Sequence, residues 1–431
     1  MCTITSDRKS LNPDKSSRKR LWWSLALITI WVGFSGIGLL AVTDGCDHEY
    51  RDAIFRDLVK NTWPVEGETE GVPERLCYYF GFWLPAAGVA KITGSLIVGF
   101  LFQWFYALAG TIIALLMVFR HVGKVSVVVT LIFMFWGGWD VVAWFLFDDI
   151  CEHNFHNFLI KCKEHSYLFY SHTHQSILIY FIYNQGVAIW LAIMLLLKQK
   201  DRPEALAVPL ALLAPFSPIV CGALTPAVIA GCLRKFPRGI SVANVGAALT
   251  GTLLLLFYLQ NERSGGVSFL NLRDTWPRFL GFLVLSYGVY MPFVWNSIRR
   301  NWIFWILFAT MIPMTFVLLD GFNDVAWRCT IPSTTLMMLM VMKKVVSIRN
   351  WRRPINVLFA AVIIIGMWDG VNLMAVRSVR TLVRMRHGGS MHDYQQPTIF
   401  RKAYFHDSFV ATGDSSIYVK YLMPTRDSKK K

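Results

Sequence analysis

The chain has 431 residues, of which 55% are hydrophobic and only 16% are charged. This balance excludes an ordinary soluble globular protein, in which about 25% of residues are charged. The net charge of +16 would suggest nucleic acid as the partner of a soluble protein. However, no nucleic-acid-binding motif is present, and membrane proteins collect basic residues in their cytoplasmic loops. We therefore expect membrane lipids as partners, and no nucleic acid.

Long apolar windows predict an all-α integral membrane protein. About 20 apolar helical residues cross a bilayer core, and residues 21–43 contain no charge. The stretch 205–233 contains four prolines, which favours two short spans or a broken pair. Together the windows predict about 11 transmembrane helices, within a range of about 10–13, in a domain over residues 21–376. The other windows are 95–119, 125–147, 175–197, 239–259, 276–298, 302–319, 330–342 and 354–376.

The basic residues predict the orientation. Residues 1–20 carry six Lys or Arg, so we expect a cytoplasmic N-terminus in the plasma membrane. The loops 44–94 and 148–174 are then on the outer side, and an acidic first loop agrees with this position. The tail, residues 377–431, is also placed outside. Its first ten residues contain four arginines, against the charge rule, but a long terminal segment can translocate regardless.

The first outer loop begins with a predicted amphipathic helix. Tyr50, Ile54 and Leu58 follow helical spacing, so we expect this helix to lie on the membrane surface. Asp44, Asp47 and His48 are spaced i, i+3, i+4 and share one face at the mouth of the first span. They could supply a general base or hold a divalent metal. Alternatively, Asp44 caps the helix and the other two belong to a solvated face.

Charged residues inside or beside apolar spans form further candidates. Asp140 interrupts an apolar run, where an ionised carboxylate costs about 3 kcal/mol. Asp324 and Arg328 are spaced i, i+4, and a buried arginine held by an aspartate suits a phosphate. The pair could equally fasten two helices together. Asp369, in the last span, could pair with Arg328 or with Asp140.

Histidines and cysteines gather in the predicted outer loops. The loop 148–174 holds half of the ten histidines, without a compact zinc motif, so a solvated, partly titrating loop is the main interpretation and a metal site the alternative. Cys46 and Cys77 lie in the first loop, and Cys151 and Cys162 in the second. Each pair could form a disulfide in an oxidising compartment, or all four could be free thiols.

The arrangement resembles the GT-C class of membrane glycosyltransferases, which use polyprenyl-phosphate sugars. The resemblance rests on an acidic first outer loop after the first span, a surface helix and then a dozen or so spans. More narrowly, the chain looks like a bacterial family of multi-pass inner-membrane proteins related to that class. In that family a first-loop motif of Asp, Trp, Lys and His is expected; Asp44 and His48 fit its ends, whereas Gly45 and Asp47 replace the middle residues. The other matching segments are Trp63-Pro64, YYFGFWLPAAGVAK at 78–91, GWD ending at 140, NDVAWRCTIP at 323–332 and YVKYL at 418–422.

This resemblance implies an enzyme that moves a sugar from a polyprenyl-phosphate donor to an envelope glycan, lipid or protein acceptor on the outer face. Asp44 would be the base, beside Asp47 and His48, and Arg328 the phosphate anchor, with Asp140 and Asp324 also in substrate binding. A divalent metal could assist. One alternative is a multi-pass transporter, supported by the broken stretch 205–233 and the intramembrane aspartates. Another is a non-catalytic membrane subunit of an envelope-polysaccharide assembly.

Overall fold

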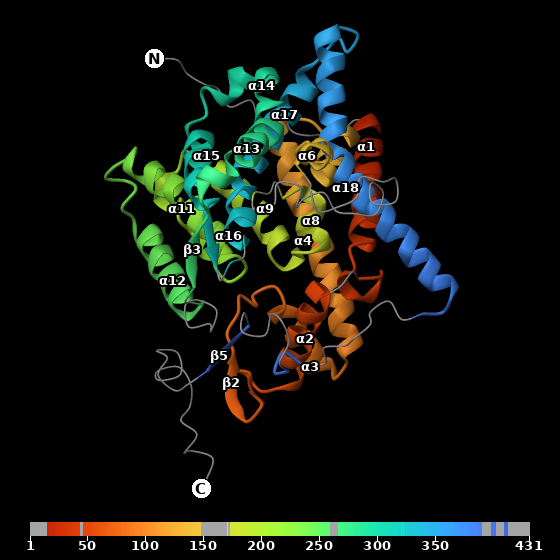
Figure 1. Cartoon of the computed structure of the whole chain (residues 1–431), viewed down its shortest axis with the longest axis vertical. Helices are drawn as coiled ribbons and strands as arrows, with labels where there is room; N and C mark the ends of the chain where they lie inside the picture. Colours follow the sequence, from red (N-terminus) through yellow and green to blue (C-terminus); the bar gives the residue numbers. More distant parts are fainter. Residues whose placement is uncertain are drawn as a thin grey trace.

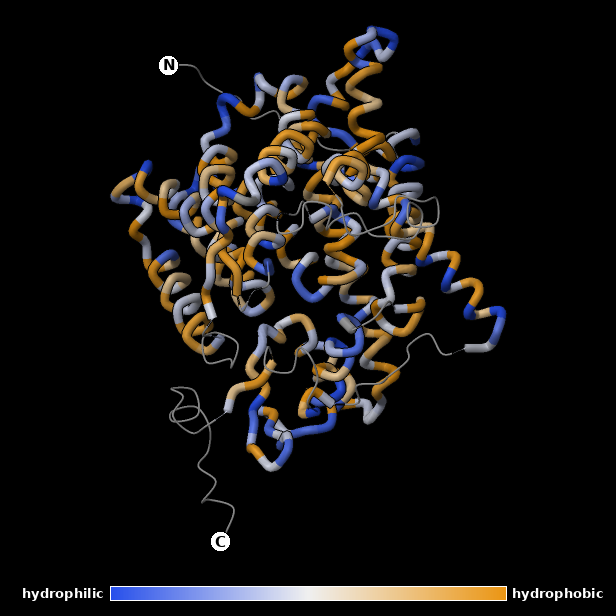
Figure 2. The backbone as a smooth tube through the Cα atoms, in the orientation of Figure 1, coloured by the Kyte–Doolittle hydropathy of each residue, from blue (hydrophilic) through white to orange (hydrophobic). Residues whose placement is uncertain are grey.

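The computed structural model describes residues 15–43, 46–147, 170, 173–258, 266–319, 321, 323–389, 398–401 and 409–412, without the side chains of Cys46 and Asp274. Asp44, the cysteines at 151 and 162 and most of the second outer loop lie outside this range. Figure 1 shows a helical bundle above a smaller unit that contains α2 (Cys46–Lys60), α3 (Leu84–Thr93) and β2 (Val72–Leu76). Hydrophilic residues are frequent in the smaller unit and at the outer ends of the bundle helices (Figure 2).

The bundle is almost entirely helical, as the sequence predicts, with a single large apolar core that continues into the smaller unit. Its only strands among the described residues are the short pair β3 (Val267–Phe269) and β4 (Val317–Leu319). The bundle helices are α1 (Lys15–Gly33), α4 (Leu96–Val122), α5 (Val127–Phe135), α6 (Asp140–Phe147), α8 (Gln175–Tyr180), α9 (Tyr183–Gln199), α10 (Val208–Leu213), α11 (Pro218–Leu233), α12 (Val242–Tyr258), α13 (Leu272–Leu283), α14 (Met291–Ile298), α15 (Trp302–Met314), α16 (Asp324–Cys329), α17 (Ile331–Ser347) and α18 (Pro354–Arg386).

Several helices are long and apolar enough to cross a membrane, as expected of a membrane protein. Within the described residues there are four such helices, or five if one bent pair counts as a span. The expectation of about eleven spans is therefore not supported. The four long helices are Leu96–Val122, Val127–Phe147, Asp324–Ser347 and Pro354–Arg386; shorter apolar helices of 10–17 residues are Pro203–Leu213, Pro218–Leu233, Val242–Tyr258 and Trp302–Met314.

Breaks in the helices explain the lower count. The predicted span 21–43 ends as a regular helix at Gly33, and the chain then turns at Gly36, whose φ of 89° favours glycine. The stretch 205–233 divides into α10 and α11, and α11 starts at Pro218, which confirms the predicted break. A π-helical turn at Val284–Gly288 continues α13, and the segment Thr275–Gly288 is bent by 71° relative to α14.

The predicted helix of the first outer loop is present as α2, but it is not a surface helix. Every residue from 50 to 58 is buried, including the apolar Tyr50, Ile54 and Leu58. The helix packs against α3, and the ring of Tyr50 stacks on Phe409 from the tail at 5.4 Å. Because protein covers its polar side as well, α2 acts as the core of the smaller unit.

The C-terminal tail completes this unit. Strand β5 (Val410–Thr412) adds to the antiparallel hairpin of β1 (Glu66–Thr69) and β2, with Arg75 opposite Ala411. The buried carboxylate of Asp57 accepts hydrogen bonds from Thr398 Oγ1 at 2.9 Å and from the Ile399 amide at 2.7 Å. The tail and the first loop therefore lie on the same side of the bundle.

The segment of residues 78–83, which follows β2, attaches the smaller unit to the bundle. The Gly81 amide donates to the carbonyl of Pro215, in the break between α10 and α11, at 3.0 Å. A Cβ at Gly81 would lie 2.7 Å from that carbonyl oxygen, so the two backbones meet only because residue 81 has no side chain.

We predict that Gly81→Ala lowers the free energy of unfolding by about 1–3 kcal/mol, because a methyl group must displace a backbone carbonyl. The matched control is Gly88→Ala in α3, where no described atom lies within 4 Å of the added carbon. This control is expected to be neutral or to stabilise by up to about 1 kcal/mol. Thermal unfolding in detergent measures both; equal melting temperatures would contradict the close contact.

Candidate functional site

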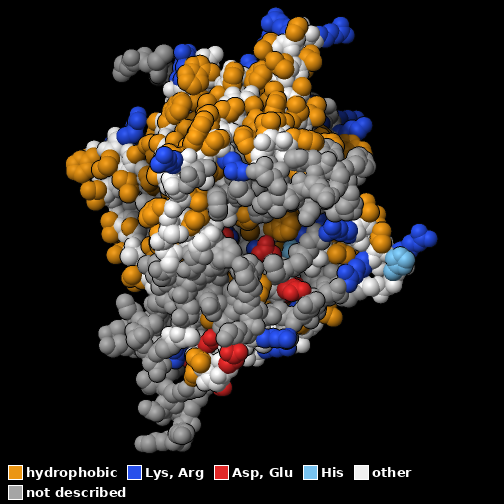
Figure 3. Space-filling view, in the orientation of Figure 1, with side chains coloured by type: hydrophobic (Ala, Val, Ile, Leu, Met, Phe, Trp, Pro, Cys, Tyr) orange, Lys and Arg blue, Asp and Glu red, His pale blue; other side chains and the backbone are white. Residues whose placement is uncertain are grey.

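Two buried arginines approach the same pair of tyrosines where the smaller unit meets the bundle. We call Arg51, Arg328, Tyr78, Tyr79 and Tyr183 the arginine–tyrosine cluster. Arg51 comes from α2, Arg328 from α16 and Tyr183 from the first turn of α9, while the two remaining tyrosines directly follow β2. Figure 3 shows that the face of the molecule is hollowed near the boundary between bundle and smaller unit, where acidic side chains are visible among basic ones.

Arg51 is 6% exposed. Its guanidinium pairs with Asp47, one helical turn earlier, at 3.4 Å, and its Cζ lies 5.7 Å from the centre of the Tyr183 ring. Burial lowers the pKa of Arg51, but Asp47 and the neighbouring tyrosines raise it, and the net pKa is above its ordinary value. The arginine is therefore charged. Its Nε and Nη1 atoms have no hydrogen-bond acceptor among the described residues.

Arg328 is 8% exposed and forms the predicted pair with Asp324. Its Nη1 donates to Asp324 Oδ1 at 2.5 Å and to the Asp324 carbonyl at 3.1 Å. Arg328 also interacts electrostatically with Tyr78 and Tyr79, the same tyrosines that act on Arg51. Its Nε has no acceptor within the described part of the chain. Both arginines thus have unused N–H donors and act electrostatically on the same two tyrosines.

The two tyrosines between the arginines are held rigidly. Their rings stack with centres 3.8 Å apart. The Tyr79 hydroxyl accepts a hydrogen bond from Gln185 Nε2 at 3.2 Å, and Gln185 Oε1 accepts one from Ser217 at 2.7 Å. The cluster is therefore connected to α9 and to the break before α11, which fixes its geometry before any ligand arrives.

His48 and Asp47 are adjacent in α2 but have different surroundings. His48 is 1% exposed, its ring stacks on Tyr183 at 5.5 Å, and its Nε2 lies 2.7 Å from the carbonyl oxygen of Tyr180. This contact requires Nε2 to carry the proton, so His48 holds the start of α2 against the α8–α9 junction. The side chain of Asp47 is 49% exposed. Asp47 is thus the accessible carboxylate; Asp44 lies outside the described residues.

The structure places Asp140 in a different part of the bundle. Asp140 is fully buried at the start of α6 and interacts with Tyr290, whose hydroxyl donates to the Gly137 carbonyl at 2.8 Å. Figure 1 shows α6 high in the bundle, far from α2. Asp369 lies three residues after Gly366, whose backbone contacts Gly137. The two intramembrane aspartates therefore occupy one neighbourhood, which is separate from α2.

Of the predicted metal-ligand residues in the second outer loop, His153, His156, His165 and His172 lie outside the described residues. In the described part of the chain, no three His, Cys, Asp or Glu side chains gather closely enough to hold a metal ion. His174, which the structure describes within the second outer loop, is fully buried and not solvated. The Sγ of Cys77 lies 3.2 Å from the Phe257 carbonyl oxygen; the side chain of Cys46 is not described, so their pairing stays a prediction.

Arg51 and the tyrosines were not candidates from the sequence. Arg51 follows Asp47 by four residues on a predicted helix, and this spacing was the signal available for it. The tyrosines belong to the segment YYFGFW, where aromatic composition alone suggests an interfacial role. Their electrostatic interaction with Arg328, about 250 residues later, follows only from the folded chain.

No family model, curated protein or solved structure matches this chain. The resemblance to the GT-C class therefore rests on the sequence motifs alone.

We predict that His48→Phe lowers the free energy of unfolding by about 1 kcal/mol, because the ring stacking survives while the hydrogen bond to the Tyr180 carbonyl is lost. Glu49→Gln, the next residue on α2, is the control and should leave the melting temperature unchanged. If His48→Phe unfolds at the wild-type temperature, the contact with Tyr180 does not stabilise the smaller unit.

Proposed function

We propose that the chain is a membrane glycosyltransferase that moves a sugar from a polyprenyl-phosphate donor to an envelope glycan, lipid or protein acceptor at the outer face of the bacterial inner membrane. The observation that supports this proposal is the convergence of Arg51 and Arg328 on Tyr78 and Tyr79, beside the half-exposed carboxylate of Asp47.

The arginines of the cluster have carboxylate counter-charges, but some of their N–H donors have no hydrogen-bond acceptor among the described residues. Each arginine already has a carboxylate partner, Asp47 or Asp324. Three guanidinium nitrogens still have no acceptor among the described residues, namely Nε and Nη1 of Arg51 and Nε of Arg328. A buried N–H without an acceptor costs about 1–3 kcal/mol. A phosphate supplies several oxygens in the geometry that guanidinium groups match.

The proposed reaction uses Asp47 as a general base. An acceptor hydroxyl gives its proton to the carboxylate, and its oxygen forms a bond to the anomeric carbon of the donor sugar. The bond between that carbon and the phosphate oxygen breaks, and its electron pair leaves with the polyprenyl phosphate. Arg51 and Arg328 stabilise the charge that develops on this leaving group. Asp44, one turn before Asp47 in the sequence, is the second candidate for the base.

The lipid nature of the donor fits the position of the cluster. Arg328 lies near the start of the apolar helical stretch Asp324–Ser347, so a phosphate at the cluster would be next to long apolar helices. A polyprenyl chain can stay in the bilayer while its phosphate reaches the two arginines. Sugar and acceptor then meet outside the hydrocarbon region.

We predict that Arg51→Gln and Arg328→Gln each reduce sugar transfer from a polyprenyl-phosphate sugar by about 100-fold, because each removes donors to the leaving phosphate. Arg75→Gln removes the same charge from the pair with the half-exposed Glu66 in the same unit and should retain full activity. Asp47→Asn should lower kcat with little change in KM. Transfer at the wild-type rate by both cluster variants, in folded protein, would rule out this site.

A transporter is the second candidate, favoured by the 71° bend between α13 and α14 and by the buried Asp140 beside Tyr290. Solute uptake into proteoliposomes that depends on Asp140 and persists in Arg51→Gln would favour transport. Transfer that depends on Arg51 and persists in Asp140→Asn would favour the enzyme.

A further inference from the structure

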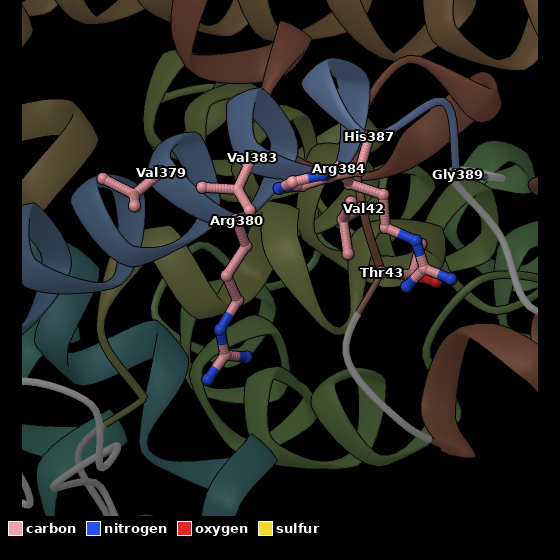
Figure 4. Close-up of a pocket in the computed structure, with 8 residues that line it drawn as sticks. All are labelled: Val42, Thr43, Val379, Arg380, Val383, Arg384, His387 and Gly389. Atoms are coloured by element: carbon pink, nitrogen blue, oxygen red, sulfur yellow. The ribbon is translucent and has the colours of Figure 1, made fainter.

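A separate pocket lies between residues 42–43, which follow α1, and the C-terminal part of α18 (Figure 4). Its volume is about 680 Å³. Val42 and Thr43 form one wall and α18 forms the other. The residues that line it are Val42, Thr43, Val379, Arg380, Val383, Arg384, His387 and Gly389.

Buried contacts hold the two walls together. Arg377, which is fully buried, donates to the Val42 carbonyl at 2.7 Å, and the Val42 amide donates to Thr381 Oγ1 at 3.2 Å. The Arg377 guanidinium also lies 5.1 Å from the centre of the Phe181 ring. These contacts fix the backbone of Val42 against one face of α18, so the fold itself shapes the pocket.

The pocket is cationic on one side and apolar on the other. Arg380 and Arg384 are spaced i, i+4 and lie on the same part of α18, with His387 one turn further. Val379 and Val383 also line the pocket and are more than half exposed. Figure 3 shows basic and histidine side chains at the outer end of this helix, next to hydrophobic ones.

An exposed apolar stripe leads from the bundle to this pocket. Ile364, Trp368, Val371, Val379 and Leu382 are all exposed. At about 100° per residue, these positions fall within an arc of about 80° around α18. The helix is long and apolar enough to cross a membrane. The stripe therefore provides a surface for a hydrocarbon chain, and Val379 connects it to the arginines.

We propose that this pocket binds an anionic phospholipid, with its phosphate at Arg380 and Arg384 and an acyl chain along the exposed stripe of α18. A free phosphate would use the arginines but leave the apolar stripe uncovered. Basic residues at a membrane surface each strengthen the binding of anionic lipid by about fivefold. Such a modest gain in affinity is sufficient to bind a lipid that is abundant in the surrounding leaflet. A scarce lipid, such as a polyprenyl-phosphate donor, would require tighter binding. The inference does not depend on the proposed transfer reaction.

The test measures lipid binding by the full-length chain. The purified protein, delipidated in a neutral detergent, is titrated with phosphatidylglycerol and with phosphatidylcholine, and bound lipid is counted by native mass spectrometry. Phosphatidylglycerol should bind more tightly in the wild type. The double variant Arg380→Gln with Arg384→Gln should lose about 20-fold in phosphatidylglycerol affinity. The control, Arg352→Gln with Arg353→Gln, removes the same charge at the other end of α18 and should bind as the wild type.

A second variant covers the case in which the double variant does not fold. Val383→Trp fills the pocket and keeps both arginines, and it should also weaken phosphatidylglycerol binding. Unchanged affinity in either folded variant would overturn the proposal. Competition by inorganic phosphate at concentrations similar to the lipid would overturn it in favour of a free-anion site. Because neither variant touches the arginine–tyrosine cluster, loss of sugar transfer is a separate result.

Discussion

The burial of the Arg51 guanidinium is the constraint on which the arrangement of the smaller unit depends. A charged group removed from water costs several kcal/mol unless its surroundings replace the lost hydration. Asp47, one turn earlier on α2, supplies the counter-charge, and the Tyr183 ring covers one face of the guanidinium. Both partners offset part of the cost of burying the Arg51 charge. The orientation of α2 relative to the first turn of α9 is therefore strongly restricted.

Other contacts, at the start and near the end of α2, hold the helix in the same orientation. His48 connects its first turn to the carbonyl of Tyr180, and Asp57 near its end accepts two hydrogen bonds from the tail. The segment that carries Tyr78 and Tyr79 is fixed in turn by the close approach of Gly81 to Pro215. Arg328, from α16, acts electrostatically on the same tyrosines, so residues of the first loop and of the bundle together form one polar cluster.

Contacts within one helix could be predicted from the sequence, whereas contacts between residues far apart in the chain could not. The spacing of Tyr50, Ile54 and Leu58 predicted α2, and the i, i+4 spacing predicted the pair of Asp324 with Arg328, because both depend on neighbouring turns of one helix. The burial of α2 could not be predicted, since Ile399 and Phe409 contact it from more than 330 residues away. Hydropathy windows predicted more spans than the described helices support, because they measure composition and do not detect a turn such as that at Gly36. Asp140 was grouped with Arg328 by residue type alone, whereas its neighbour in the fold is Tyr290.

The position of the arginines at the C-terminal end of α18 is explained better by their contacts than by the charge rule for membrane orientation. By charge count alone, Arg377, Arg380 and Arg384 belong on the cytoplasmic side, opposite the first loop. The tail that follows them nevertheless pairs with β2, so the end of α18 and the first loop are on the same side of the bundle. Arg377 is used inside the protein, where it fixes Val42. Arg380 and Arg384 line a pocket that combines positive charge with exposed valines. A positive charge that opposes the orientation rule is expected to be retained where it has such a use, and a phosphate-bearing lipid is a ligand that uses both parts of this pocket.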